Sequence, residues 1–188
     1  MPVAIVTGSS GGIGRGIALR LADDGFDVVV NDIAPKQANI DAVVAEINAK
    51  GKNAVGIAAD VSNKEQVQAL VSGAVEKFGA LNVMVANAGI LETTPLLELS
   101  VEQWDRSMAI NLRGVFLCIQ TSALQFINQG GGSQSITACS ISRYRTNALG
   151  QELFPENIAG LVSFLAGKDS SHMTGQSIIC DGGGFINF

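Results

Sequence analysis

The chain has 188 residues, with 12 Lys and Arg against 17 Asp and Glu, and a formal net charge of −5. Hydrophobic residues make up 47% and charged residues 15%, which excludes intrinsic disorder and predicts one packed domain over residues 1–188. The acidic balance argues against a nucleic-acid partner. No uninterrupted apolar run of about 18 residues occurs, so we expect no membrane-spanning segment.

Short apolar, β-branched runs alternate with segments of helical periodicity along the chain. We predict strands at Val3–Val6, Asp27–Asp32, 53–58, Val83–Ala86, 133–138 and 176–180. Apolar residues spaced three and four apart predict helices over 13–21, 40–47, 67–78, Val101–Asn128 and 158–165. Apolar strands separated by helices indicate a parallel sheet covered on both faces. The predicted fold class is therefore α/β, a doubly wound parallel sheet of the Rossmann type.

A glycine-rich loop, TGSSGGIG over residues 7–14, joins the first strand to the first helix. Glycine there lets the backbone approach a pyrophosphate, and the free N–H groups at the start of the helix face the anion. A glycine-rich turn without a ligand is the alternative. We predict that the phosphates are bound by Gly8, Ser10, Gly12, Ile13 and Gly14.

An acidic residue, Asp32, ends the second strand 18 residues after Gly14. An acid at this place can bind a ribose hydroxyl, and it repels a 2′-phosphate. No arginine follows it closely, so we expect NAD rather than NADP. The alternative is that Asp32 is a solvated acid at a strand end.

Three motifs of the cofactor half resemble the short-chain dehydrogenase/reductase family. The loop over residues 7–14 resembles its TGxxxGxG motif, Asp60-Val61 resembles its adenine-contacting pair, and Asn87-Ala88-Gly89 resembles its NAG motif. The resemblance implies that Asp60, Val61, Asn87, Ala88 and Gly89 line the cofactor site.

Two further positions match the catalytic half of the family. Asn111 corresponds to the asparagine that helps to hold a water in the proton relay, and Ser140 to the serine that binds the substrate oxygen. Within the family, the chain resembles the diacetyl/acetoin (2,3-butanediol) reductases. The resemblance implies an NAD(P)-dependent oxidoreductase that interconverts a small alcohol and ketone, works as a homo-oligomer and uses no metal.

The family's Tyr-x-x-x-Lys pair has no counterpart in this chain. The single tyrosine is Tyr144, alanine stands four residues later at Ala148, and Leu153 and Phe154 occupy the place expected for the catalytic tyrosine. We therefore predict an internal deletion near residues 142–146. It removes the family's sixth strand and active-site helix, and with them part of its oligomer contacts. A catalytically dead nucleotide-binding pseudoenzyme and a truncated splice or gene-model product are the alternatives.

The three cysteines, Cys118, Cys139 and Cys180, are odd in number and lack metal-ligand spacing. Free thiols of this kind are typical of a reducing compartment. We therefore expect a cytoplasmic protein without disulfides.

Overall fold

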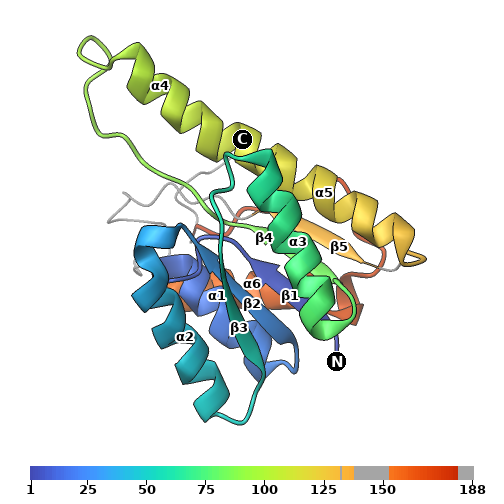
Figure 1. Cartoon of the computed structure of the whole chain (residues 1–188). Helices are drawn as coiled ribbons and strands as arrows, with labels where there is room; N and C mark the ends of the chain where they lie inside the picture. The colour runs from blue at the N-terminus through green and yellow to red at the C-terminus, as the bar shows by residue number, and fades with distance from the viewer. Residues whose placement is uncertain (132, 138–152, 182–188) are drawn as a thin grey trace.

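A computed structural model describes residues 1–131, 133–137 and 153–181. Its centre is a parallel sheet in the order β3-β2-β1-β4-β5 (Figure 1). Within it, Val6 of β1 lies between Val30 of β2 and Val85 of β4 in the sheet register. The strands are β1 (Val3–Val6), β2 (Asp27–Asp32), β3 (Ala54–Ala58), β4 (Val83–Ala86) and β5 (Gln134–Thr137).

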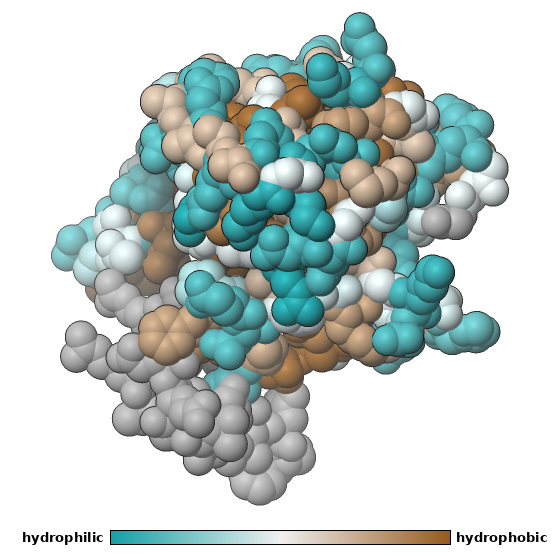
Figure 2. Space-filling view, turned by 90° about the horizontal axis from the view of Figure 1, so that it is seen from below, coloured by the Kyte–Doolittle hydropathy of each residue, from teal (hydrophilic) through white to brown (hydrophobic). Residues whose placement is uncertain are grey.

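Helices cover both faces of the sheet, which confirms the doubly wound prediction. One face carries α1 (Gly12–Asp23), α2 (Gln37–Ala49) and α6 (Pro155–Ala166), and the other carries α3 (Lys64–Phe78) and α5 (Val115–Asn128). Each face has its own apolar core, because alternate residues of β1 point to opposite sides: Val6 to the first and Ile5 to the second. Seen from below, hydrophilic residues are interspersed with small hydrophobic areas on the outer surface (Figure 2).

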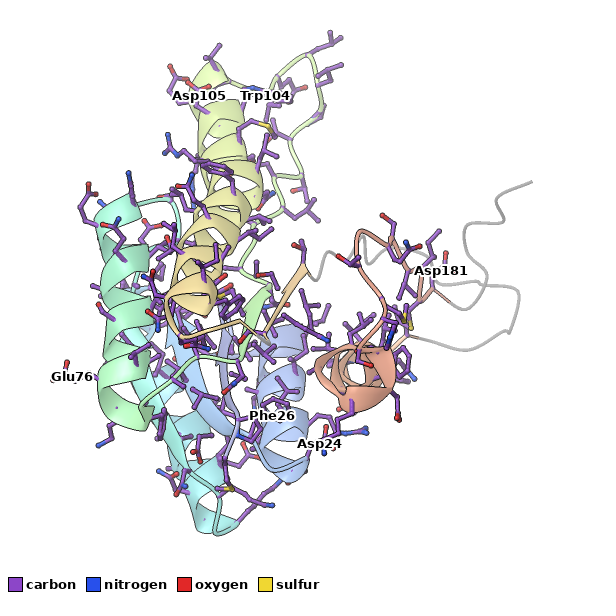
Figure 3. The ribbon with its side chains drawn as sticks, turned by 90° about the vertical axis from the view of Figure 1, so that its right-hand side faces the viewer. Asp24, Phe26, Glu76, Trp104, Asp105 and Asp181 are labelled. Carbon is purple, nitrogen blue, oxygen red and sulfur yellow. The ribbon has the colours of Figure 1, made fainter. Side chains whose placement is uncertain are left out.

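The long predicted helix contains a turn that the sequence pattern did not indicate. It consists of α4 (Val101–Met108), a π-helical segment η2 (Ala109–Gly114) and α5. At the start of α4, Ser100 and Gln103 form a reciprocal capping box. The outer end of α4 extends beyond the sheet and carries Trp104 and Asp105 (Figure 3).

The same stretch, Val101–Asn128, is one helix among the described residues that is long and apolar enough to cross a membrane. Its most apolar window has a mean hydropathy of 1.2. Of this window 28% is buried. Leu117, Cys118 and Phe126 are buried residues of this stretch that belong to the apolar core on one face of the sheet.

The prediction of a last strand over 176–180 is wrong. After α6 the chain forms a short 3₁₀ turn, η3 (Lys168–Ser170), and residues 176–180 are then irregular. A strand forms only beside a partner that completes its hydrogen bonds, and in the described residues the sheet ends at β5. A cavity of about 1150 Å³ is lined by β5, α6 and the segment 170–181.

Candidate cofactor-binding site

The predicted cofactor residues follow the carboxyl ends of four parallel strands. The chain proceeds from β1 outward to β3 and then returns to β4 on the other side of β1, so the strand order reverses between β1 and β4. Ligands of open α/β sheets bind at such a reversal. The glycine loop follows β1, Asp32 ends β2, Asp60 follows β3 and Asn87 follows β4. The fold therefore brings the residues named from sequence to one edge of the sheet.

Two glycines of the loop occupy places where a side chain does not fit. Gly8 has φ +65°, and a Cβ there would lie 2.8 Å from Ala88 Cα. A Cβ on Gly14 would overlap the Gly8 carbonyl oxygen and lie 2.6 Å from Asn87 Nδ2. The loop, the start of α1 and the segment after β4 are thus packed backbone to backbone. The binding of a cofactor by Gly8, Gly14 and Ala88 remains a prediction.

Thr7 and Asn87 join this loop to the segment after β4. Asn87 Nδ2 donates to the Thr7 carbonyl oxygen at 2.8 Å, and the backbone N–H groups of Asn87 and Ala88 each donate to Thr7 Oγ1 at 3.0 Å. The Thr7 hydroxyl in turn donates to Val85 O at 3.2 Å. Asn87 therefore positions the loop through its backbone contacts.

The first turn of α1 is open to an anion. Its N-cap, Gly11, has extended backbone (φ −171°), no side chain caps it, and the first turn contains no acidic residue. The N–H groups at Gly12 and Ile13 belong to the set that an α-helix leaves without internal partners, and the helix dipole favours negative charge there. The close backbone approach and the uncapped helix start fit the pyrophosphate of a dinucleotide.

Ser9 and Asn31 fix the loop to the end of β2, and neither was singled out from sequence. Ser9 N–H donates to Asn31 O at 2.8 Å, and Asn31 N–H donates to Ser9 Oγ at 3.1 Å. Asn31 Nδ2 reaches β3, donating to Ile57 O at 2.9 Å and to Ala59 O at 3.2 Å. Both side chains are buried. In the sequence, Asn31 could have been noticed as a polar residue that directly follows three valines in a predicted buried strand.

The Asp32 carboxylate is held from three directions. Its Oδ1 accepts the Ile33 N–H at 2.9 Å, and its Oδ2 accepts the Ser10 hydroxyl at 2.6 Å. Lys36 of the short 3₁₀ turn η1 (Ala34–Lys36) places Nζ 3.4 Å from the same Oδ2. Asp32 therefore lies beside the glycine loop, next to Ser10, and is not a fully solvated acid.

Asp60 and Val61 order the turn after β3. Asp60 Oδ1 accepts hydrogen bonds from the backbone N–H and the hydroxyl of Ser62, at 2.8 and 2.7 Å. Val61 is buried, and a Cβ on Gly114 would lie 2.8 Å from Val61 Cγ2. The pair thus connects β3 to the π-helical segment, and its contact with adenine remains a prediction.

Asn111 lies in η2 and contacts the backbone that follows the NAG motif. Its Oδ1 accepts the Ile90 N–H and its Nδ2 donates to Ile90 O. A Cβ on Gly89 would lie 3.2 Å from Asn111 Oδ1, so this glycine gives the amide its room. The Asn111 side chain therefore satisfies the backbone N–H and carbonyl groups of Ile90. Asn111 also lies in a π-helical turn, and such turns are frequent at functional sites.

The second catalytic candidate, Ser140, lies outside the described residues, as do Tyr144 and the predicted deletion near 142–146. Leu153 and Phe154, which stand where the tyrosine was expected, are partly exposed at the start of α6. Among the described residues, no group of three or more His, Cys, Asp or Glu is placed to hold a metal ion.

Comparisons with known proteins agree with this architecture. The sequence profile of the short chain dehydrogenase family matches residues 2–149. A short-chain dehydrogenase/reductase of Hericium erinaceus is 37% identical over 243 aligned positions, covering 96% of each chain. A diacetyl reductase [(S)-acetoin forming] of Staphylococcus epidermidis is 34% identical, over 96% of this chain and 97% of its own.

A solved structure is similar along almost the whole chain. It is a short-chain type dehydrogenase/reductase from Mycobacterium marinum with a TM-score of 0.89 and 26% identity, covering 97% of this chain and 95% of that one. The parallel sheet, the glycine loop between β1 and α1, and these matches lead to one assignment. The chain belongs to the short-chain dehydrogenase/reductase family of oxidoreductases.

Proposed function

We propose that this chain binds NAD(H) and serves the reversible conversion of a small alcohol and ketone, of the acyloin or diketone class. The observation that carries the proposal is the uncapped start of α1 beside the packed glycine loop, with the Asp32 carboxylate next to it. The diacetyl reductase of Staphylococcus epidermidis supports the substrate class. We place the protein in the cytoplasm.

Bound NAD would supply the hydride acceptor, and NADH the donor. The chain's own residues would hold the pyrophosphate and the adenosine half of the dinucleotide. The first-turn N–H groups of α1 would bind the pyrophosphate, and Asp32 would bind the adenosine ribose. Asn87 and Asn111 would keep the surrounding backbone in place through their contacts with Thr7 and Ile90.

Proton transfer to the substrate oxygen is the step for which the sequence lacks the family's residues. A phenol needs a nearby cation to act as a base near neutral pH, since its ordinary pKa is about 10. Tyr144 has Ala148 four residues later, and no lysine lies between Lys77 and Lys168. The missing lysine favours a second candidate function, a nucleotide-binding protein without turnover. In such a protein Ser140 could bind a substrate oxygen, but no general acid would protonate it.

The lengths of the alignments support a deletion as the origin of this loss, and the sequence motifs predict that it lies near residues 142–146. The alignment to the Hericium erinaceus protein runs over 243 positions, 55 more than the 188 residues available here. At least that many positions of the relative therefore have no counterpart in this chain. The cavity between β5 and α6 is consistent with a removed sheet neighbour.

The two candidates are separated by expressing residues 1–188, confirming an intact mass of 19.5 kDa, and measuring NADH binding and NADH oxidation. Diacetyl, acetoin and a panel of small ketones serve as substrates. Binding with turnover near the typical enzyme rate of about 10 s⁻¹ supports the oxidoreductase. Binding without turnover supports the second candidate. Absence of NADH binding in the folded chain contradicts both.

A further inference from the structure

The peptide group between Ala59 and Asp60 is held at both of its polar atoms by side-chain amides. Its carbonyl oxygen, that of Ala59, accepts a hydrogen bond from Asn31 Nδ2 at 3.2 Å. Its N–H, that of Asp60, donates to Gln66 Oε1 at 2.8 Å. The two amides come from different elements, since Asn31 lies in β2 and Gln66 in the first turn of α3. This peptide group directly precedes the side chains of Asp60 and Val61, so the two amides fix the direction in which the turn leaves β3.

Asn31 extends the pairing of β2 with β3 by one residue. β3 ends at Ala58, but the Ala59 N–H still donates to Asp32 O at 3.0 Å. Because β2 ends at Asp32 and the chain then turns into η1, the Asn31 amide takes the place of the backbone donor that a longer β2 would offer to Ala59 O. The backbone of Asn31 also exchanges hydrogen bonds with Ser9, at 2.8 and 3.1 Å. Asn31 therefore connects the glycine loop to the turn after β3.

The Asn31 side chain makes these contacts at some expense to stability. Asn31 is 1% exposed, and within the described part of the chain its Oδ1 is a buried oxygen without a hydrogen-bond partner. Burial of an unpaired polar oxygen destabilises a fold. What the amide contributes is the orientation of the Ala59–Asp60 peptide group, which supports a role in positioning in addition to packing.

We propose that Asn31 and Gln66 are positioning residues for the recognition of adenine. The inference rests on the proposed binding of NAD(H), with the adenine at Asp60 and Val61 as the family resemblance implies. An ionised carboxylate only accepts hydrogen bonds, so Asp60 can bind the 6-amino group of adenine but not the 6-oxygen of hypoxanthine. The direction of this carboxylate follows from the peptide group that the two amides hold. Loss of either amide should therefore weaken the discrimination between the two bases, while the backbone contacts of Asn31 with the glycine loop stay in place.

The test measures dissociation constants for NADH and for reduced nicotinamide hypoxanthine dinucleotide, in which a carbonyl replaces the 6-amino group, by nicotinamide fluorescence. The parent should bind NADH roughly tenfold more tightly, the value of a charge-assisted hydrogen bond. In Asn31→Leu and in Gln66→Met this ratio should fall to about threefold or less. Asn48→Leu is the matched control and should keep the parent ratio, because Asn48 holds the opposite end of β3, with its Oδ1 accepting the Ala54 N–H at 2.8 Å.

An unchanged ratio in folded Asn31→Leu or Gln66→Met protein overturns the proposal, as does an equal fall of the ratio in Asn48→Leu. A parent chain that binds the two dinucleotides equally also overturns it, and leaves the proposed binding of NADH standing. A folded parent chain that binds neither dinucleotide overturns the proposed function together with this inference. Thermal melting shows whether each protein is folded. Gln66 lies at an exposed position, so Gln66→Met decides the test if Asn31→Leu does not fold.

Discussion

Asn111 makes a two-point contact with the backbone of Ile90, accepting from its N–H and donating to its carbonyl oxygen, each at 2.8 Å. This contact joins η2 to the chain after β4. Asn111→Ala should lower the free energy of unfolding by about 1 kcal/mol, since both hydrogen bonds are partly solvated. Urea denaturation measures the change. Asn39→Ala on the exposed side of α2 is the control, and equal losses in the two variants would contradict the structural role of Asn111.

Gly14→Ala should damage the start of α1. The added Cβ would overlap the Gly8 carbonyl oxygen and crowd Asn87 Nδ2, so the loop must shift. Such overpacking costs about 1–3 kcal/mol, and NADH affinity should fall with it. Gly160→Ala in α6 is the matched control, because nothing lies within 4 Å of its Cβ. That change should be neutral or stabilising by up to about 1 kcal/mol. Equal melting temperatures for the two variants would contradict the close packing of Gly14 against Gly8 and Asn87.

Asp32→Ala should shift cofactor preference toward NADPH. The change removes the ribose acceptor and leaves Lys36 without its acidic partner, so the ratio of the two dissociation constants should move roughly tenfold. Fluorescence titration with both cofactors gives this ratio. Asp41→Ala, an exposed acid on α2, should leave it unchanged. Equal affinities for NADH and NADPH in the parent would show that Asp32 does not select.

The Cys118 thiol should be inert in the folded protein. Burial raises its pKa from the ordinary 9.0 to about 12, so the reactive thiolate is scarce at pH 8. In a Cys139→Ser, Cys180→Ser background, native protein should not react with a disulfide reagent, and urea-unfolded protein should react quickly. Rapid reaction of the native protein would contradict the burial of Cys118.

The raised pKa of Cys118 determines how its contribution to the free energy of unfolding changes with pH. The thiol favours folding fully below pH 9, where it is protonated in both the folded and the unfolded chain. Above that pH the unfolded thiol ionises first, so this contribution is lost progressively up to about pH 12. The parent should therefore lose more stability than Cys118→Ala between these limits.

Oligomerisation should be weaker than in the family, whose members are typically oligomeric. The helical stretch α4–η2–α5 exposes Trp104, Leu112, Phe116, Leu124 and Ile127, each by more than half. Soluble monomers rarely expose apolar patches above a few hundred Å², so the parent should self-associate without reaching one defined size. Light scattering tests this, and a monodisperse, stable tetramer would contradict it.

The sheet and its glycine loop could be predicted because their signals are local. Apolar runs of strand length, helical spacing and a glycine cluster each depend on a few neighbouring residues, and β1 to β5 lie close to their predicted positions. The strand over 176–180 failed because β propensity depends on packing against neighbouring strands. The segment contains the β-branched pair Ile178 and Ile179, but in the described part of the chain no strand of the sheet pairs with it.

The contacts within the site needed the fold. Thr7 and Asn87 are 80 positions apart, and the sequence does not show that their polar groups meet. The π-helical turn at η2 could not be predicted from its own sequence either, because Gly114 of this turn packs against Val61, which comes from a distant part of the chain. Sequence motifs identified residues that the fold brings to one edge of the sheet, while tertiary packing determines what each of their polar atoms contacts.

The position of β5 at an edge of the sheet should make the protein prone to aggregation through this strand. Among the described residues β5 is paired on one side only, and its four residues, QSIT, contain neither a charge nor a proline. Natural edge strands are guarded by such residues because unpaired backbone groups act as a template for other chains. Concentrated samples should therefore convert to strand-linked fibrils after a lag that shortens when preformed seed is added. Ser135→Lys, at an exposed position of β5, should lengthen that lag.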